Sequence, residues 1–275
     1  AALKEKHKKL IDDFAFIAAS NVGGEFMSDD KVARVKALSE QTWLRHFDDT
    51  LGLSSVEELV KKEALNPHFP VIEKLLSDKA EHIVERDRKV EFDPKFGIKM
   101  DVPEHQYNLG EVYNLTISRG TLTAEDRYKI NEHMISTIKM LDNLPFPPEL
   151  SRVPRYASTH HETLKGTGYP RKLTADDLSI PERILVIADI FEALTASDRP
   201  YKKANPVSVP VDIMYKMALD QHLDIELFRL FLQSGTHIKY AQKYLKSEQI
   251  DEIDLSKYLQ PEQLGEVDLS KKLTA

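Results

Sequence analysis

Four side chains in this sequence have the chemistry and surroundings of metal ligands: His133, His160, His161 and Asp189. His133 stands beside the apolar stripe of a predicted helix, so it should face inward or lie at the edge of the core. His160 and His161 are adjacent and come just before a glycine-rich turn. Asp189 lies within an apolar helix, where an isolated carboxylate would be costly, so it needs a charge partner or a metal.

The donor types limit which metal could bind. The chain has no cysteine, which excludes disulfides, thiolate metal sites and cysteine nucleophiles. Imidazoles together with a carboxylate suit Fe, Mn, Zn or Ni. Each histidine taken alone could equally be a packing residue, and only their occurrence together with the turn at 166–170 favours a metal site. Most other histidines are interpreted as surface or packing residues: His7, His46, His68, His82, His222 and His237.

The composition indicates a globular chain of 275 residues with a net charge of −7. Non-specific binding of duplex nucleic acid needs a basic face, so we expect no duplex partner. No apolar run approaches the length of a membrane span, and the N-terminus has no apolar core of the signal-peptide kind. We therefore expect a cytoplasmic protein. The chain does not begin with Met, so we also expect a further domain upstream.

Helical spacing of apolar residues dominates, and no convincing hairpin appears. In the first hundred residues, helices are predicted over about 4–20 and 28–44, from 56 onward, and after Pro70. Their apolar stripes need a partner surface, so we expect this region to pack on the rest of the chain: Phe14, Ile17, Val32, Val35 and Trp43. In the second part the pattern predicts helices over about 123–141, 148–162, 181–196, 207–220, 223–234 and 236–246.

A charged, aperiodic stretch over 77–104 is interpreted as a long surface connection. We place a boundary near residue 100. The predicted organisation is a helical N-terminal region over 1–100, an extension or signalling connector, followed by a domain over 101–250. An acidic, loosely docked tail is predicted over 251–275.

Three motifs resemble the HD-GYP domain, which belongs to the HD phosphohydrolase superfamily. They are H-H-E-x-x-x-G-T-G-Y-P at 160–170, A-D-I-F-E-A-L at 188–194 and D-R-P-Y-K at 198–202. The strings G-T-L-T at 120–123 and N-E-H-M at 131–134 match the segment around the family's third ligand histidine. The resemblance covers roughly residues 104–240. It implies an all-α fold, an HD-type helical bundle with an N-terminal helical extension.

The resemblance also implies a function, that of a bacterial signal-transduction domain which hydrolyses or binds cyclic di-GMP. The four residues above would be metal ligands, with divalent iron or manganese as the expected cofactor and as many as two ions. Gly168, Tyr169 and Pro170 would shape the ligand loop and contact substrate, and Arg199 and Lys202 would meet phosphate.

One departure from the family concerns its namesake His-Asp pair and the following Gly-Lys. Glu104, His105 and Asn108 stand where the histidine, aspartate and lysine are expected. Glu104 and His105 are still able to ligate metal, and we expect them to lie near the metal cavity. A bridging carboxylate is harder to replace, and no catalytic residue is assigned.

Three functions therefore stay open. The first is an active cyclic di-GMP phosphodiesterase. The second is a degenerate domain that binds a nucleotide, or a protein partner in cyclic-dinucleotide signalling, and hydrolyses little. The third is a hydrolase of another phosphoester, since one superfamily hosts many reactions. Metal content separates the first two, because two or more metals per chain would favour catalysis and none would favour a binding domain. For the oligomeric state, a homodimer is one alternative.

Overall fold

The computed structural model describes residues 2–61, 68–196 and 205–259. These residues are mostly helical, which confirms the predicted all-α class. They form two compact units, each discontinuous in sequence: residues 1–91 with 101–130, and residues 92–100 with 131–275. The predicted domain boundaries near 100 and 250 stay predictions. Among the described helices, none combines the length and the hydrophobicity that a membrane crossing requires.

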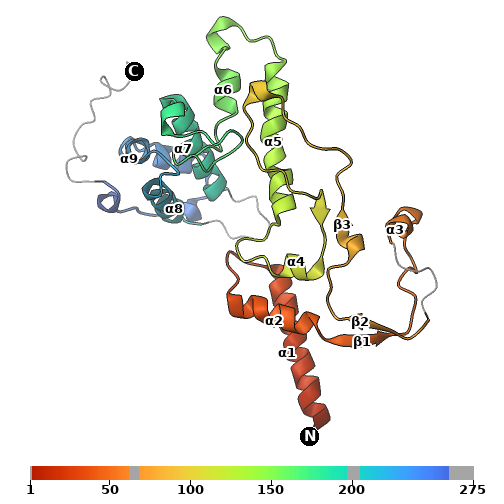
Figure 1. Ribbon diagram of the computed structural model, residues 1–275. Coiled ribbons are helices and arrows are strands. Elements are labelled where there is room, and N and C mark those ends of the chain that lie inside the picture. Colours follow the sequence, from red (N-terminus) through yellow and green to blue (C-terminus); the bar gives the residue numbers. More distant parts are fainter. Residues whose placement is uncertain (1, 62–67, 197–204, 260–275) are drawn as a thin grey trace. The chain divides into compact units, whose positions relative to one another are not determined.

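The first unit begins with two predicted helices, α1 (Ala2–Val22) and α2 (Asp29–Ser39), seen in Figure 1. Helix α2 was predicted to reach residue 44, but it ends at Ser39, because the chain continues as strand β1 (Thr42–Arg45). Strand β1 pairs antiparallel with β2 (Val71–Lys74). The helix predicted after Pro70 is therefore wrong, and the β-branched pair at its start favours a strand instead.

Four further short elements belong to this unit. Helix α3 (Ser55–Val60) starts at the predicted serine cap, where the Ser54 hydroxyl accepts a hydrogen bond from the Glu57 amide. Strands β3 (Ile83–Val84) and β4 (Tyr107–Asn108) form a second antiparallel pair, and α4 (Glu111–Leu115) follows. The described stretch 77–104 contains no α-helix, but it includes β3 and two short 3-10 helices, Ala80–His82 and Pro94–Phe96, and its role as a surface connection stays a prediction.

The apolar stripes of the first unit are covered unequally. Val35 is fully buried within α2, whereas Phe14 on α1 is 77% exposed and Trp43 is 40% exposed. The proposed packing of these stripes on the rest of the chain stays a prediction.

Helix α5 (Ala124–Asp142) begins in the first unit and continues into the second, which takes over at Asn131. A reciprocal cap fixes its start. The Asp126 amide donates to Thr123 Oγ1 at 3.0 Å, and the Thr123 amide donates to Asp126 Oδ2 at 3.2 Å. Met134 is buried as predicted, so the turn of α5 that carries His133 is held in place by the core.

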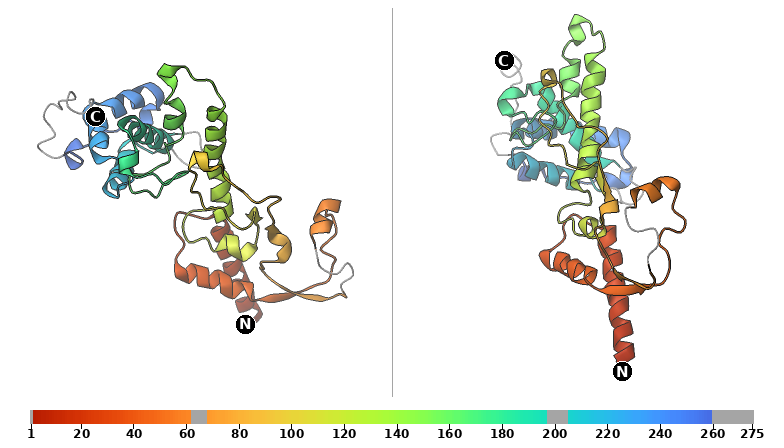
Figure 2. Two further views of the ribbon diagram at one scale, coloured as in Figure 1. Left: turned by 45° about the horizontal axis from the view of Figure 1, so that its top comes forward. Right: turned by 45° about the vertical axis from the view of Figure 1, so that its right-hand side comes forward.

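The second unit contains α6 (Val153–Ala157), α7 (Ile180–Thr195), α8 (Ser208–Leu219), α9 (Ile225–Gln233) and α10 (Thr236–Tyr244). Helices α7, α8 and α9 gather together in every view (Figures 1 and 2). Their shared core includes Phe191, Met214 and Phe228. The last four of these helices lie where the apolar periodicity predicted them.

Helix α6 is much shorter than the helix predicted over 148–162. Its end has a local cause in the side chains that follow it. The Ser158 hydroxyl donates to Arg155 O at 3.0 Å, and the Thr159 hydroxyl donates to Tyr156 O at 3.1 Å. Such side-chain bonds compete with the helical ladder. The chain therefore leaves the helix before the histidine pair.

The start of the predicted acidic tail is docked, contrary to expectation. Tyr258 and Leu259 are buried. The Tyr258 hydroxyl donates to Asp212 Oδ1 at 2.6 Å, and burial together with this carboxylate raises the pKa of Tyr258. The tail beyond residue 259 lies outside the described residues.

Candidate metal centre

Three histidines come together in the second unit. One ligand nitrogen each from His133, His160 and His161 lies within 4.8 Å of the other two. His133 comes from α5, and the adjacent pair comes from the turn after α6. The Nε2 atoms of His133 and His161 are 3.2 Å apart. Two nitrogens that each lie about 2.0–2.1 Å from one cation are roughly 2.8–3.4 Å apart when the angle at the cation is between 90° and the tetrahedral value. The observed spacing therefore fits a shared ion.

Asp189 lies beside this cluster on α7. Its Oδ2 is 3.9 Å from Nδ1 of His161, and its side chain is 40% exposed. The expectation that Asp189 is buried among apolar neighbours is therefore wrong. The core face of α7 is formed instead by Val186, Ile187 and Phe191, and Asp189 stands at the edge of that face. It supplies the carboxylate that the sequence predicted next to the histidines.

The protonation states of the pair suit metal binding. His160 Nδ1 lies 2.9 Å from the carbonyl oxygen of Ala157, which can only accept, so in the neutral imidazole Nδ1 carries the proton and Nε2 keeps its lone pair. Burial, together with neighbouring His160 and His133 and against the opposing effect of Asp189, lowers the pKa of His161 to about 4. His161 is therefore neutral near pH 7. Neutral imidazoles beside a carboxylate are a donor set that fits a divalent cation.

The Gly-Tyr-Pro turn at 168–170 packs directly on the histidine pair. A Cβ atom at Gly168 would lie 2.5 Å from both Glu162 Cα and His161 O, so only glycine fits this approach. The Tyr169 amide donates to His161 O at 3.1 Å. The Tyr169 ring stacks on the His161 ring with centroids 4.7 Å apart. The turn thereby fixes one face of the His161 imidazole.

The three residues of this turn differ in exposure. Gly168 and Pro170 are buried, and Tyr169 is half-buried. Burial raises the pKa of Tyr169 to about 12, and Asp189 raises it too, so the phenol keeps its proton. Contact of this turn with a substrate stays a prediction, and Tyr169 offers the surface for it.

The structure does not place the other predicted site residues relative to this cluster. Arg199 and Lys202 lie outside the described residues. Glu104 and His105 belong to the first unit, where His105 Nδ1 is 3.3 Å from Glu85 Oε2 and the Glu104 side chain is 87% exposed. Their role as ligands stays a prediction.

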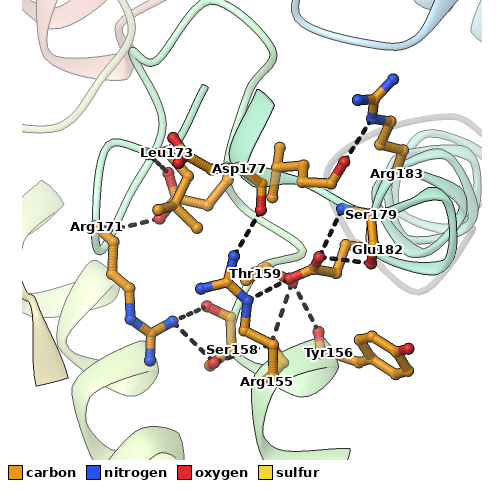
Figure 3. Close-up of polar contacts among 12 residues, drawn as sticks. Arg155, Tyr156, Ser158, Thr159, Arg171, Leu173, Asp177, Ser179, Glu182 and Arg183 are labelled. Atoms are coloured by element: carbon orange, nitrogen blue, oxygen red, sulfur yellow. Dashed lines mark hydrogen bonds and ion pairs between the residues drawn. The ribbon is translucent and has the colours of Figure 1, made fainter. Parts of the chain in front are cut away.

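A partly buried polar network near the histidine turn was not anticipated from the sequence (Figure 3). Arg155 on α6 donates through Nε to Glu182 Oε1 at 2.6 Å and through Nη2 to Asp177 O at 2.8 Å. The other Glu182 oxygen accepts from the Ser179 amide and hydroxyl, which caps α7. This network ties α6 to the start of the helix that carries Asp189. Ser179 followed by Glu182 is a capping box, a signal that the sequence offered.

A helical unit that brings three histidines together beside a carboxylate is the arrangement to compare with known protein families. A family model described as "HD domain" matches residues 70–227 of the chain, more than half of its length. The chain therefore belongs to the HD domain family. The motifs at 160–170 and 188–194 make its domain one of the HD-GYP type.

Three similar proteins are named as phosphodiesterases of cyclic dinucleotides. A 3′3′-cGAMP-specific phosphodiesterase of Vibrio cholerae is 40% identical over 96 residues, 34% of this chain and 20% of the relative. A cyclic di-GMP phosphodiesterase of Pseudomonas aeruginosa is 36% identical over 75 residues, 27% of this chain and 17% of the relative. One of Thermotoga maritima is 32% identical over 111 residues, 40% of this chain and 30% of the relative. The chain thus spans less than a third of these relatives.

Proposed function

We propose that this chain is a metal-dependent phosphodiesterase domain that acts on a cyclic dinucleotide, with cyclic di-GMP as the expected substrate. The observation that carries the proposal is the histidine cluster, whose three ligand nitrogens lie within 4.8 Å of one another, with Asp189 beside it. The relatives named for cyclic di-GMP and 3′3′-cGAMP support this substrate class.

The proposed ligands are His133, His160, His161 and Asp189, with iron or manganese as the expected ion. Glu104 and His105 are the candidates for holding a second ion. A bound divalent cation would polarise a phosphoryl oxygen and make water a better nucleophile near neutral pH. In the reaction, the oxygen of water joins phosphorus and the ribose 3′-oxygen leaves with a proton. The product is a linear dinucleotide.

The chain's own residues have separate tasks in this proposal. His161 keeps a free lone pair above about pH 4, where it remains neutral. Tyr169 keeps its proton, so it can donate a hydrogen bond to a bound nucleotide but cannot act as a general base. Arg199 and Lys202 are proposed to bind the substrate phosphate, because their guanidinium and ammonium groups can neutralise its negative charge.

The direct test is turnover of cyclic di-GMP by the full chain with Mn²⁺ or Fe²⁺ supplied, followed as the appearance of linear dinucleotide. 3′3′-cGAMP is assayed in parallel to resolve which cyclic dinucleotide is preferred. We expect metal-dependent turnover that chelation abolishes. A metal-loaded chain that opens neither dinucleotide would contradict the proposed activity.

One observation favours a second candidate, a domain that binds the nucleotide without opening it. Asn108 stands at the family's lysine position, and its Oδ1 already accepts the Gly110 amide at 3.0 Å. An asparagine amide cannot supply the charge of the missing ammonium. Calorimetry that detects cyclic di-GMP binding to a metal-loaded chain with no turnover would support this alternative.

A further inference from the structure

A single residue, Arg171, contacts both ends of the turn at 158–162 that carries the histidine pair, and Figure 3 shows its contact with Ser158 at the first end. At the first end, its Nη1 donates to Ser158 O at 3.2 Å and to Ser158 Oγ at 2.9 Å. At the second end, its backbone amide donates to Glu162 Oε1 at 2.7 Å. His160 and His161 therefore lie inside a closed ring of covalent and hydrogen bonds.

The Glu162 carboxylate closes this ring from within the protein. Glu162 is 0% exposed, and its second oxygen accepts the Leu173 amide at 2.8 Å. A buried carboxylate is costly unless its oxygens are well satisfied. Both oxygens accept hydrogen bonds from backbone amides that follow the Gly-Tyr-Pro turn, those of Arg171 and Leu173. This arrangement fixes the turn relative to the histidines.

The guanidinium of Arg171 has a third attachment. Its Nε donates to Phe96 O at 2.8 Å, so the planar group joins residues 92–100 to the histidine turn. The planar guanidinium of Arg171 thus donates in two directions at once, through Nε to Phe96 and through Nη1 to Ser158. A lysine ammonium on a flexible stem cannot reproduce this set of contacts.

We propose that Arg171 is a positioning residue, which acts with Glu162 to hold His160 and His161 at the spacing that a divalent cation requires. The inference rests on the proposed function for the identity of the ion. The hydrogen bonds that Arg171 makes to Ser158 and Glu162 are at the two ends of the turn, so it acts through the backbone that bears the histidines. Outer groups that orient ligands typically contribute 10–100-fold, by order of magnitude, to metal affinity.

The test compares Arg171→Lys with a matched control, Arg183→Lys. Arg183 is also a part-buried arginine of the second unit, and it donates to Leu178 O, Ala175 O and Asp224 Oδ2. Each full-length variant is titrated with Co²⁺, and the visible absorption of the bound ion is recorded. We expect Arg171→Lys to weaken Co²⁺ binding about 10–100-fold and to alter the spectrum, while Arg183→Lys leaves both unchanged. Equal affinity and an unchanged spectrum in Arg171→Lys would overturn the inference.

A metal-free measurement separates this inference from the proposed function. The ring ¹⁵N–¹H correlations of His160 and His161 are recorded without metal for wild type and both variants. We expect the ring signals to shift in Arg171→Lys and not in Arg183→Lys. If wild type binds no Co²⁺, the proposed function fails, and the ring signals alone decide the positioning role. Unchanged signals then overturn it.

Glu162→Gln provides a second variant in case Arg171→Lys does not fold. Its amide nitrogen would face a backbone donor, so one of the two loop contacts is lost. We expect the same weakening of Co²⁺ binding and the same shift of the histidine signals. Wild-type affinity and wild-type signals in a folded Glu162→Gln chain would also overturn the inference.

Discussion

The Nε2 atoms of His133 and His161 face each other across 3.2 Å, although 28 residues separate them in the chain. The two rings meet edge to face, with an interplanar angle of 89°, while Tyr169 stacks on His161 at 24°. His161 is therefore in contact with both the helix that carries His133 and the Gly-Tyr-Pro turn. It is the residue at which the elements of the site meet.

His161→Asn should abolish tight metal binding. Removing a direct ligand should cost more than the roughly 10–100-fold typical of an outer-shell partner. The measurement is bound Mn or Fe per chain after loading and desalting, by plasma mass spectrometry. His222→Asn is the matched control, because His222 is also a half-buried histidine of the second unit and is not one of the three clustered histidines. Retention of metal by His161→Asn would exclude this histidine as a ligand.

Gly168→Ala should destabilise the second unit and disturb the histidine pair. Its methyl group would lie 2.5 Å from the Glu162 Cα and His161 O atoms, so the backbone must shift, at a cost of about 1–3 kcal/mol. Denaturant unfolding measures the loss, and metal content measures the disturbance. Gly24→Ala is the control, because a Cβ there meets nothing within 4 Å. If Gly168→Ala were as stable as Gly24→Ala, the turn would not pack against Glu162 and His161 as closely as described.

The helices around the site could be predicted from the sequence because their apolar periodicity and caps are local signals. Helices α7 to α10 and the capped start of α5 lie where those signals place them. The strand β2 could not be predicted in this way, because its partner β1 is remote in sequence and a short apolar run fits either a helix or a strand.

The candidate site was predicted in its residue types but not in its supports. His160 and His161 were found because they lie in one contiguous motif with the turn, and His133 because it stands beside the apolar stripe of a predicted helix. Glu162 and Arg171 were not found, because charged residues are usually exposed. Only the fold shows that the Glu162 carboxylate accepts backbone amides and that the Arg171 guanidinium donates to Ser158 and Phe96. The exposure of Asp189 was also misjudged, since a run of apolar neighbours along a helix does not tell which face is covered.

Restoring the family's pair should raise both metal uptake and turnover. The variant combines Glu104→His, His105→Asp and Asn108→Lys, which returns a carboxylate able to bridge two ions and a cation for phosphate. We expect additional bound metal per chain and faster opening of cyclic di-GMP than in the natural sequence. The same metal and turnover assays apply to both chains. Full-rate turnover by the natural chain with two bound metals would show that another carboxylate already serves as the bridge.

Burial of His222 should make the stability of the protein depend on pH. Burial lowers the pKa of His222, and the nearby Asp220 only partly offsets this. Below the unfolded pKa of about 6.5, the unfolded chain binds a proton that the folded chain does not. The free energy of unfolding therefore falls as the pH falls from that value towards the folded pKa.

His222→Gln should lessen this dependence. Urea unfolding of wild type and variant at about pH 7.5 and pH 5.5 provides the measurement, and the difference between the two chains isolates His222 from other titrating groups. We expect wild type to lose more stability than the variant over this interval. Equal losses would mean that His222 takes up its proton at the same pH in both states.

The hydrogen bond from Arg171 to the carbonyl of Phe96 joins residues 75 positions apart, and this has a practical consequence for anyone who shortens the chain. Cutting at residue 100 would follow the charge pattern, yet it would discard residues 92–100, which belong to the same compact unit as the histidines. It would also remove two contacts to the turn, namely the Phe96 carbonyl, which accepts from Arg171, and the Lys99 amide, which donates to Pro170 O at 2.8 Å. A truncated protein for crystallisation or assay should therefore start upstream of Phe92.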